Sequence, residues 1–93
     1  MYFEEEAKII NYCEEANVPY TTESISLMST MHYIYIYDAG LYNLKKSNKE
    51  KYKDLYVPYI RLNWECGMWY VRDNGYCDYM PESVIFERID ELK

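Results

Sequence analysis

The sequence predicts an α+β fold in which a small antiparallel sheet carries one helix from each end of the chain. Three observations support this fold: helical periodicity at both ends, a middle section rich in β-branched and aromatic residues, and an Asn-Gly pair between two such stretches. Helices and antiparallel strands that are segregated along a chain pack as two layers. Both helices are therefore expected on one face of the sheet.

The N-terminal helix is predicted over residues 2–16. Phe3, Ala7, Ile10 and Cys13 recur at helical spacing, and acidic residues fill the first turn, where they suit the positive end of the helix dipole. An Asn-Val-Pro sequence follows and ends the helix.

Two strands are predicted between Ser24 and Tyr37, the first from Ser24 through Ile25 and Leu27 and the second over residues 32–37. Side chains alternate between the two faces of a strand, so the isoleucines of the second strand should face the core. The opposite face then carries a row of three tyrosines, either under a helix or open to a partner: Tyr33, Tyr35 and Tyr37.

A turn is predicted at residues 38–40 and a further short strand at residues 41–44. Residues 45–54 are almost wholly polar, so they should form an exposed loop or one short helix. Strand character resumes over residues 57–64, with a proline near the start, where its missing N–H does least harm.

A hairpin and a helix complete the chain. Residues 68–72 and 76–79 flank Asp73-Asn74-Gly75, whose Asn-Gly pair suits a type I′ turn. Residues 81–92 are predicted to be helical, because Ile85, Ile89 and Leu92 lie on one stripe.

The alternative fold is a winged helix, which requires two helices within residues 22–46 and uses the Asn-Gly hairpin as its wing. The alternating Ile-Tyr run argues against it, since that pattern is typical of a strand. A winged helix would in turn indicate binding to duplex DNA.

Size and composition favour a single domain, residues 1–93, that folds. Apolar residues make up 49% of the chain, far from the composition of disordered proteins. The longest apolar run, residues 33–37, is too short for a membrane span, and the acidic N-terminus does not resemble a secretion signal. Three widely spaced cysteines are typical of a reducing compartment, so a cytoplasmic protein is expected.

No catalytic, cofactor or metal site is predicted, and the chain is not expected to be an enzyme. His32 is the only histidine, and its three possible cysteine partners lack the short spacing of structural zinc sites. With three glycines and no phosphate-binding motif, the chain offers little backbone for cradling a cofactor.

The formal charge of −6 is unevenly distributed along the chain. Residues 1–44 carry −6, residues 45–56 carry +3 and residues 57–93 carry −3. The basic segment, Lys45 to Lys53, has tyrosines nearby as in single-strand binders, yet the net charge disfavours direct nucleic-acid binding.

The favoured function is a small protein-binding inhibitor or modulator whose carboxylates imitate phosphates and block the basic groove of a nucleic-acid enzyme or defence complex. Acidic rows are steered to cationic clefts, so the partner is a protein with a basic surface. Abundant Tyr, Ile, Asn and Lys is a style typical of phage and mobile-element accessory proteins, although no motif matches. The candidate contacts form two groups. The first is Glu4, Glu5, Glu6, Glu14 and Glu15, and the second is Asp73, Asp78, Glu82, Glu87, Asp90 and Glu91.

The alternative function is a homo-oligomeric structural or regulatory adaptor, for example a homodimer, with an aromatic interface. Large aromatic side chains carry much of the binding energy at protein interfaces. Its candidate contacts are Tyr33, Tyr35, Tyr37, Trp64, Trp69 and Tyr70.

Overall fold

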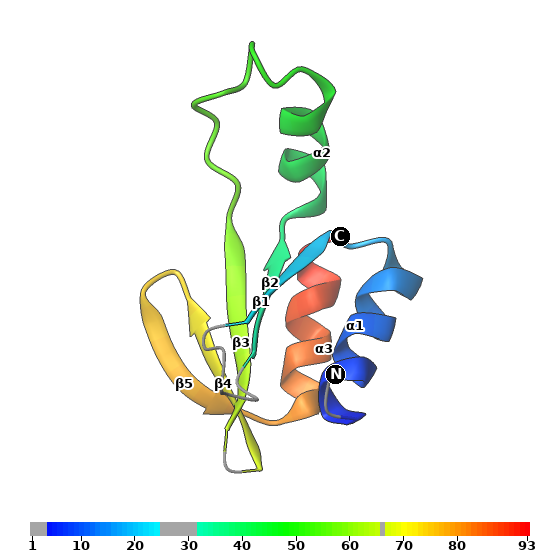
Figure 1. Cartoon of the computed structure of the whole chain (residues 1–93), viewed down its shortest axis with the longest axis vertical. Helices are drawn as coiled ribbons and strands as arrows, with labels where there is room; N and C mark the ends of the chain where they lie inside the picture. Colours follow the sequence, from blue (N-terminus) through cyan, green and yellow to red (C-terminus); the bar gives the residue numbers. More distant parts are fainter. Residues whose placement is uncertain (1–3, 25–31, 66) are drawn as a thin grey trace.

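The computed structural model describes residues 4–24, 32–65 and 67–93, which form three helices and one five-stranded sheet (Figure 1). The predicted α+β class, with a helix at each end of the chain and an antiparallel sheet between, is confirmed. In chain order the elements are α1 (Glu4–Ala16), β1 (Tyr20–Ser24), β2 (His32–Tyr37), α2 (Ala39–Ser47), β3 (Tyr59–Glu65), β4 (Met68–Asp73), β5 (Tyr76–Met80) and α3 (Glu82–Glu91).

The sheet is a meander in which each strand pairs antiparallel with the next strand of the chain, in the order β1-β2-β3-β4-β5. Its register places Ile34 opposite Leu62, and Leu62 opposite Val71, so apolar residues form a row across the three central strands. The winged-helix alternative is wrong, because β2 occupies part of the segment where that fold needs a helix.

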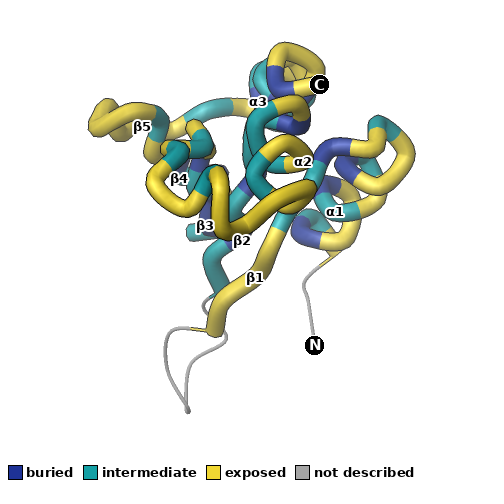
Figure 2. The backbone as a smooth tube through the Cα atoms, turned by 90° about the horizontal axis from the view of Figure 1, so that it is seen from above, coloured by how far each residue is buried: buried dark blue, intermediate teal, exposed yellow. Residues whose placement is uncertain are grey.

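The core lies between one face of the sheet and the helices α1 and α3. Ile9 and Cys13 of α1 join Ile85 and Ile89 of α3 in one cluster with the apolar row of the sheet, and all four are fully buried (Figure 2). The predicted stripe of the C-terminal helix is therefore confirmed. Burial raises the pKa of the Cys13 thiol to about 12, which makes it an inert core residue. Among the described helices, none combines the length and the apolar character that a membrane crossing demands.

The buried stripe of α1 differs from the predicted one. Glu6, Ile9 and Cys13 are the buried residues of this helix, whereas Ala7 is exposed and Ile10 is half-buried. The helix is thus rotated about its axis relative to the prediction, and the carboxylate of Glu6 lies on its buried face.

The end of α1 is as predicted. Asn17 adopts a left-handed conformation with φ of 57°, which reverses the chain. The next N–H, from Val18, donates a 2.9 Å hydrogen bond to the carbonyl of Cys13 and satisfies an open carbonyl of the last turn.

The first strand begins earlier than predicted. β1 starts at Tyr20, immediately after Pro19, and its two threonines have the β-branched side chains that favour a strand. The prediction started this strand at Ser24, where β1 ends, and its continuation through Ile25 and Leu27 lies outside the described residues.

The predicted short strand at residues 41–44 is wrong, because these residues belong to α2. The Oδ1 atom of Asp38 accepts a 2.9 Å hydrogen bond from the N–H of Leu41 and caps the helix. The polar segment predicted as a loop or short helix is divided: residues 45–47 finish α2, and turns follow to residue 54.

The Asn-Gly hairpin is confirmed. Asn74 and Gly75 have φ values of 54° and 84°, the two left-handed conformations that a type I′ turn requires, and they connect β4 to β5. The strand predicted from residue 57 begins at Tyr59 in β3, after the proline.

Candidate functional site

The two helices on the sheet form an acidic layer. In the described structure α1 and α3 pack side by side (Figure 1). Residues 4–16 and 82–93 contain nine carboxylates, eight of them outside the core and one the buried Glu6, against three cations, a net charge of −6 that equals the formal charge of the whole chain. The predicted acidic surface is therefore concentrated on one layer, which we call the acidic layer.

The structure places the predicted acidic contacts of α1 in different environments. Glu4, Glu14 and Glu15 are exposed and Glu5 is half-buried. Glu14 also accepts a 2.6 Å hydrogen bond from the hydroxyl of Tyr20, which fixes the last turn of α1 to β1. These four carboxylates reach the surface of the acidic layer.

Glu6 is not on that surface. Its exposed fraction is 1%, and its Oε2 atom lies 3.2 Å from Nδ1 of His32 at the start of β2. A buried carboxylate needs a partner, and the ring of His32 is in place to provide a cation or a hydrogen-bond donor. Glu6 therefore connects α1 to the sheet.

The two predicted acidic residues of the hairpin are separate from α1. Asp73 forms an ion pair with Arg88 of α3, which ties the end of β4 to that helix. Asp78 is exposed on β5, the edge strand on the side away from α1 (Figures 1 and 2). The structure brings neither of them into one row with the carboxylates of α1.

A hydrogen bond and a ring stack hold α1 against α3. The Tyr12 hydroxyl lies 2.9 and 3.0 Å from the two carboxylate oxygens of Asp90, and its ring stacks on Phe86 with centroids 4.3 Å apart. This hydroxyl lowers the pKa of the Asp90 carboxyl, and the same bond raises the pKa of Tyr12. Neither residue was predicted to join the helices, since their pairing spans 78 positions of the chain.

The opposite face of the sheet carries the predicted tyrosine row. Tyr33 and Tyr35 meet edge to face with centroids 6.3 Å apart, and Tyr59 of β3 lies 5.7 Å from Tyr35 and 5.8 Å from Tyr37. Tyr37 also contacts Tyr42 of α2 at 5.2 Å, so the rings continue from the sheet to that helix. We call these five rings the tyrosine surface. The prediction of Trp69 as an interface residue is wrong, because its side chain is buried in the core, whereas Trp64 and Tyr70 are half-buried.

Polar contacts fix the tyrosine surface. The hydroxyl of Tyr35 donates a 2.9 Å hydrogen bond to Glu23, and burial together with this bond raises the pKa of Tyr35. The guanidinium of Arg61 lies 4.4 Å from the ring centroid of Tyr33, in cation–π geometry. The three predicted tyrosines are each half-buried, and the α1 and α3 helices lie on the other face.

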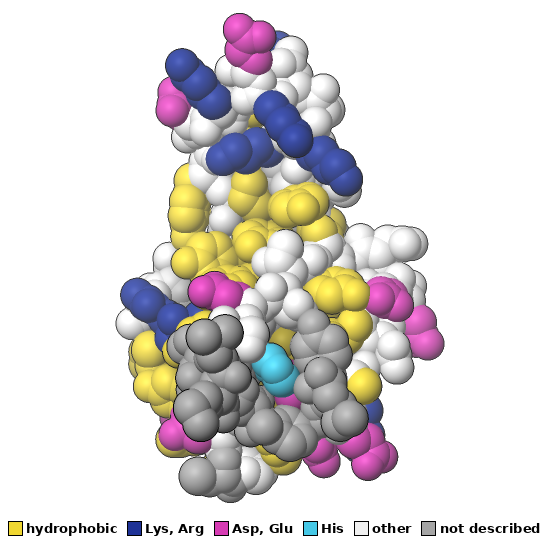
Figure 3. All heavy atoms as spheres, in the orientation of Figure 1, with side chains coloured by type: hydrophobic (Ala, Val, Ile, Leu, Met, Phe, Trp, Pro, Cys, Tyr) yellow, Lys and Arg dark blue, Asp and Glu magenta, His cyan; other side chains and the backbone are white. Residues whose placement is uncertain are grey.

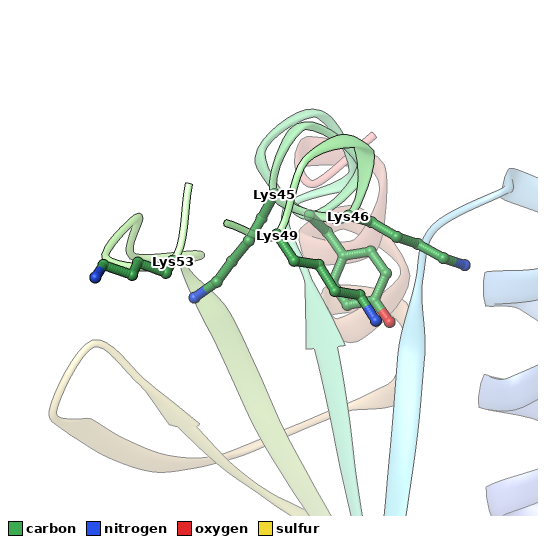
Figure 4. Close-up of a pocket in the computed structure, with 5 residues that line it drawn as sticks. Lys45, Lys46, Lys49 and Lys53 are labelled. Carbon is green, nitrogen blue, oxygen red and sulfur yellow. The ribbon is translucent and has the colours of Figure 1, made fainter. Parts of the chain in front are cut away.

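A third feature is a lysine cluster at the α2 end of the molecule (Figure 3). Lys45, Lys46, Lys49 and Lys53 line one cavity of about 440 Å³ together with Tyr42 (Figure 4). The cluster contains four of the five lysines of the basic segment, which was predicted as an exposed loop or one short helix with direct nucleic-acid binding disfavoured.

An apolar groove adjoins the lysine cluster. It also measures about 440 Å³ and shares Tyr42 and Lys45 with the first cavity. Its other lining residues are Thr21, Tyr37, Leu55, Tyr56, Val57 and Tyr59.

In the described ranges, no three side chains of His, Cys, Asp or Glu lie close enough together to hold a metal ion. Comparison of the chain with protein-family models, with curated proteins and with solved structures finds no match.

Proposed function

We propose that this chain is a binding protein that inhibits or modulates a protein partner by placing its acidic layer in a basic groove, where a nucleic acid would otherwise lie. The observation that supports this proposal is the net charge of −6 on residues 4–16 and 82–93, which are the two adjacent helices and the two residues after α3. A rigid row of carboxylates resembles a phosphate backbone in charge and needs no rearrangement on binding.

The contacts are the surface carboxylates of the layer. Glu4 and Glu15 are exposed at the two ends of α1, and Glu87 is exposed on α3. Their charge steers association with a cationic cleft and accounts for partner choice, while salt screens it. Binding is therefore expected to weaken steeply as ionic strength rises.

Charge reversal at Glu4 and Glu15 tests this proposal. Glu4→Lys with Glu15→Lys is expected to lower partner binding by more than about tenfold, because like charges then face the groove. The partner is first identified by affinity capture from host lysate with low-salt and high-salt washes, and its affinity is then measured with purified proteins.

The control is Glu50→Lys with Asp54→Lys, which changes the net charge equally but on exposed residues after α2. This pair should bind almost as the unmodified protein does. Full binding by the Glu4/Glu15 variant, or capture that resists high salt, would argue against charge mimicry.

The second candidate function is a homo-oligomeric adaptor that self-associates through the tyrosine surface. The continuous ring contacts between β2 and β3 favour it, because clustered aromatic residues are common at interface centres. Under this alternative Tyr35→Ala lowers the association state in sedimentation experiments, whereas Tyr35→Phe, which keeps the ring, does not. An unchanged profile for Tyr35→Ala would remove this candidate.

A further inference from the structure

Hydrogen bonds fix the helix and the turn that carry the lysine cluster. α2 is capped by Asp38, and the Nζ atom of Lys45 donates a 2.9 Å hydrogen bond to the carbonyl of Leu55 in the returning chain. Asn48 accepts a 3.0 Å hydrogen bond from the N–H of Lys51 and so fixes the turn after the helix. These contacts fix the side chain of Lys45 and the backbone from which the other lysines project.

The same end of the molecule presents aromatic rings beside the ammonium groups. Tyr56 has an exposed fraction of 65% and Tyr59 one of 39%, and both line the groove that adjoins the lysine cavity. Tyr42 and Lys45 belong to both cavities. Cations and exposed rings are thus contiguous. Figure 3 shows apolar and aromatic side chains directly next to the lysines.

We propose that this end of the molecule binds single-stranded nucleic acid, with phosphates at the lysine cluster and a base against the tyrosines of the groove. A cationic track beside stacking rings is the common arrangement of single-strand binding sites. Both cavities fall within the range of roughly 300–1,000 Å³ that is typical of ligand sites. The site borders the acidic layer at one point, where Lys46 and Glu14 line a common hollow, and its other lysines do not line that hollow. The proposed ligand goes beyond the function proposed for the acidic layer.

The net charge of −6 does not exclude this ligand, because the charges are segregated. The molecule is 41 Å long, and the lysines lie at one extreme of its long axis, beyond the helices of the acidic layer (Figures 1 and 3). Charges separated by more than a Debye length, about 8 Å at physiological ionic strength, are largely screened. Residues 45–56 keep their own charge of +3.

The chemistry of the site favours a single strand over other anions. An acidic peptide would satisfy the lysines but would leave the exposed rings of Tyr56 and Tyr59 without planar partners. A duplex presents phosphates but hides the faces of its bases, so the rings again gain nothing. A single strand offers both groups at once.

Fluorescence anisotropy with the full chain and a labelled oligothymidylate of about 12 nucleotides tests the proposal. Binding is expected at low salt, with a slope of log K against log salt of about −2.8 for four phosphate contacts. Lys46→Glu with Lys49→Glu removes two exposed lysines of the cluster and should reduce the slope to about −1.4.

The matched control is Lys8→Glu with Lys93→Glu, which makes the same change in net charge at exposed lysines of the acidic layer. Its affinity for the oligonucleotide should stay close to that of the unmodified protein. Tyr56→Ala should weaken binding by about fivefold or more through loss of stacking, and Tyr56→Phe should restore it.

Four results would overturn the proposal: an anisotropy that does not change at low salt, equal losses in the two lysine variants, equal affinity for a duplex of the same length, or equal affinity for polyglutamate. The Lys46/Lys49 variant and the Tyr56 variants alter no carboxylate of the acidic layer, so a negative result with them leaves the protein-binding proposal untouched.

Discussion

Trp69→Ala is expected to lower the free energy of unfolding by about 3–5 kcal/mol, the usual cost of deleting a buried aromatic side chain. Trp69 lies in β4 with an exposed fraction of 2%, and its ring meets Trp64 edge to face with centroids 5.1 Å apart. Domains of this size have a total stability of about 5–15 kcal/mol, so the variant should be partly or wholly unfolded at moderate temperature.

Trp69→Phe is the matched control. It keeps an aromatic ring in the core and removes the indole N–H, which is buried and has no hydrogen-bond acceptor in the described part of the chain. An unsatisfied buried donor costs about 1–3 kcal/mol, so removing it offsets part of the lost volume. Urea unfolding followed by circular dichroism measures both variants. A cost below about 1 kcal/mol for Trp69→Ala would contradict the packing described here.

Glu6→Lys is expected to lower the free energy of unfolding by about 3–5 kcal/mol. The change places an ammonium group in the interior, against the ring of His32, in place of the carboxylate that lies 3.2 Å from Nδ1. Because the site is 1% exposed, water cannot solvate the new charge without opening the contact between α1 and β2.

Glu4→Lys is the control, since it makes the same charge reversal on the same helix at an exposed position. Surface changes of this kind are usually within about 0.5 kcal/mol of neutral. Thermal unfolding of the two variants under one set of conditions is the measurement, and equal melting temperatures would show that Glu6 is not buried in solution. A binding test should therefore leave Glu6 unchanged, because reversing the charge of Glu4, Glu5 and Glu6 together would lower binding and unfold the protein at the same time.

Local signals in the sequence predicted the parts of the fold that depend on local chemistry. The terminal helices follow from apolar spacing, and the hairpin follows from the need for two left-handed residues at Asn74 and Gly75. The inward-facing isoleucines of β2 follow from strand alternation, as Ile34 and Ile36 are fully buried.

The prediction missed α2 because two local signals compete there. Gly40 and the apolar residues after it favour a turn and a strand, whereas Asp38 is also a good helix cap. The cap wins in the structure, where Asp38 accepts from the N–H of Leu41 and Lys45 bonds to the carbonyl of Leu55. The second contact joins residues ten positions apart across the turns after α2, and no periodic pattern in the sequence predicts it.

The sequence predicted which residue types the candidate surfaces contain, but not which of those residues reach the surface. The sequence shows many carboxylates, but burial of Glu6 and pairing of Asp73 with Arg88 depend on how helices sit on the sheet. The sequence located the basic segment along the chain, but only the structure shows where its lysines lie in space relative to the helices. The tyrosine row was foreseen on β2, whereas its extension to Tyr42 and Tyr59 required the register and the position of α2.

The meander order of the sheet has a consequence for how the chain folds. Because each strand pairs only with its neighbours in sequence, most of the sheet can form by closing short loops in succession, which costs little entropy at each step. Mixed domains dominated by such local contacts reach the native state faster than sheets with distant pairings. The contact between α1 and α3 joins the first helix to the last one described, so during synthesis it forms only after α3 has emerged from the ribosome.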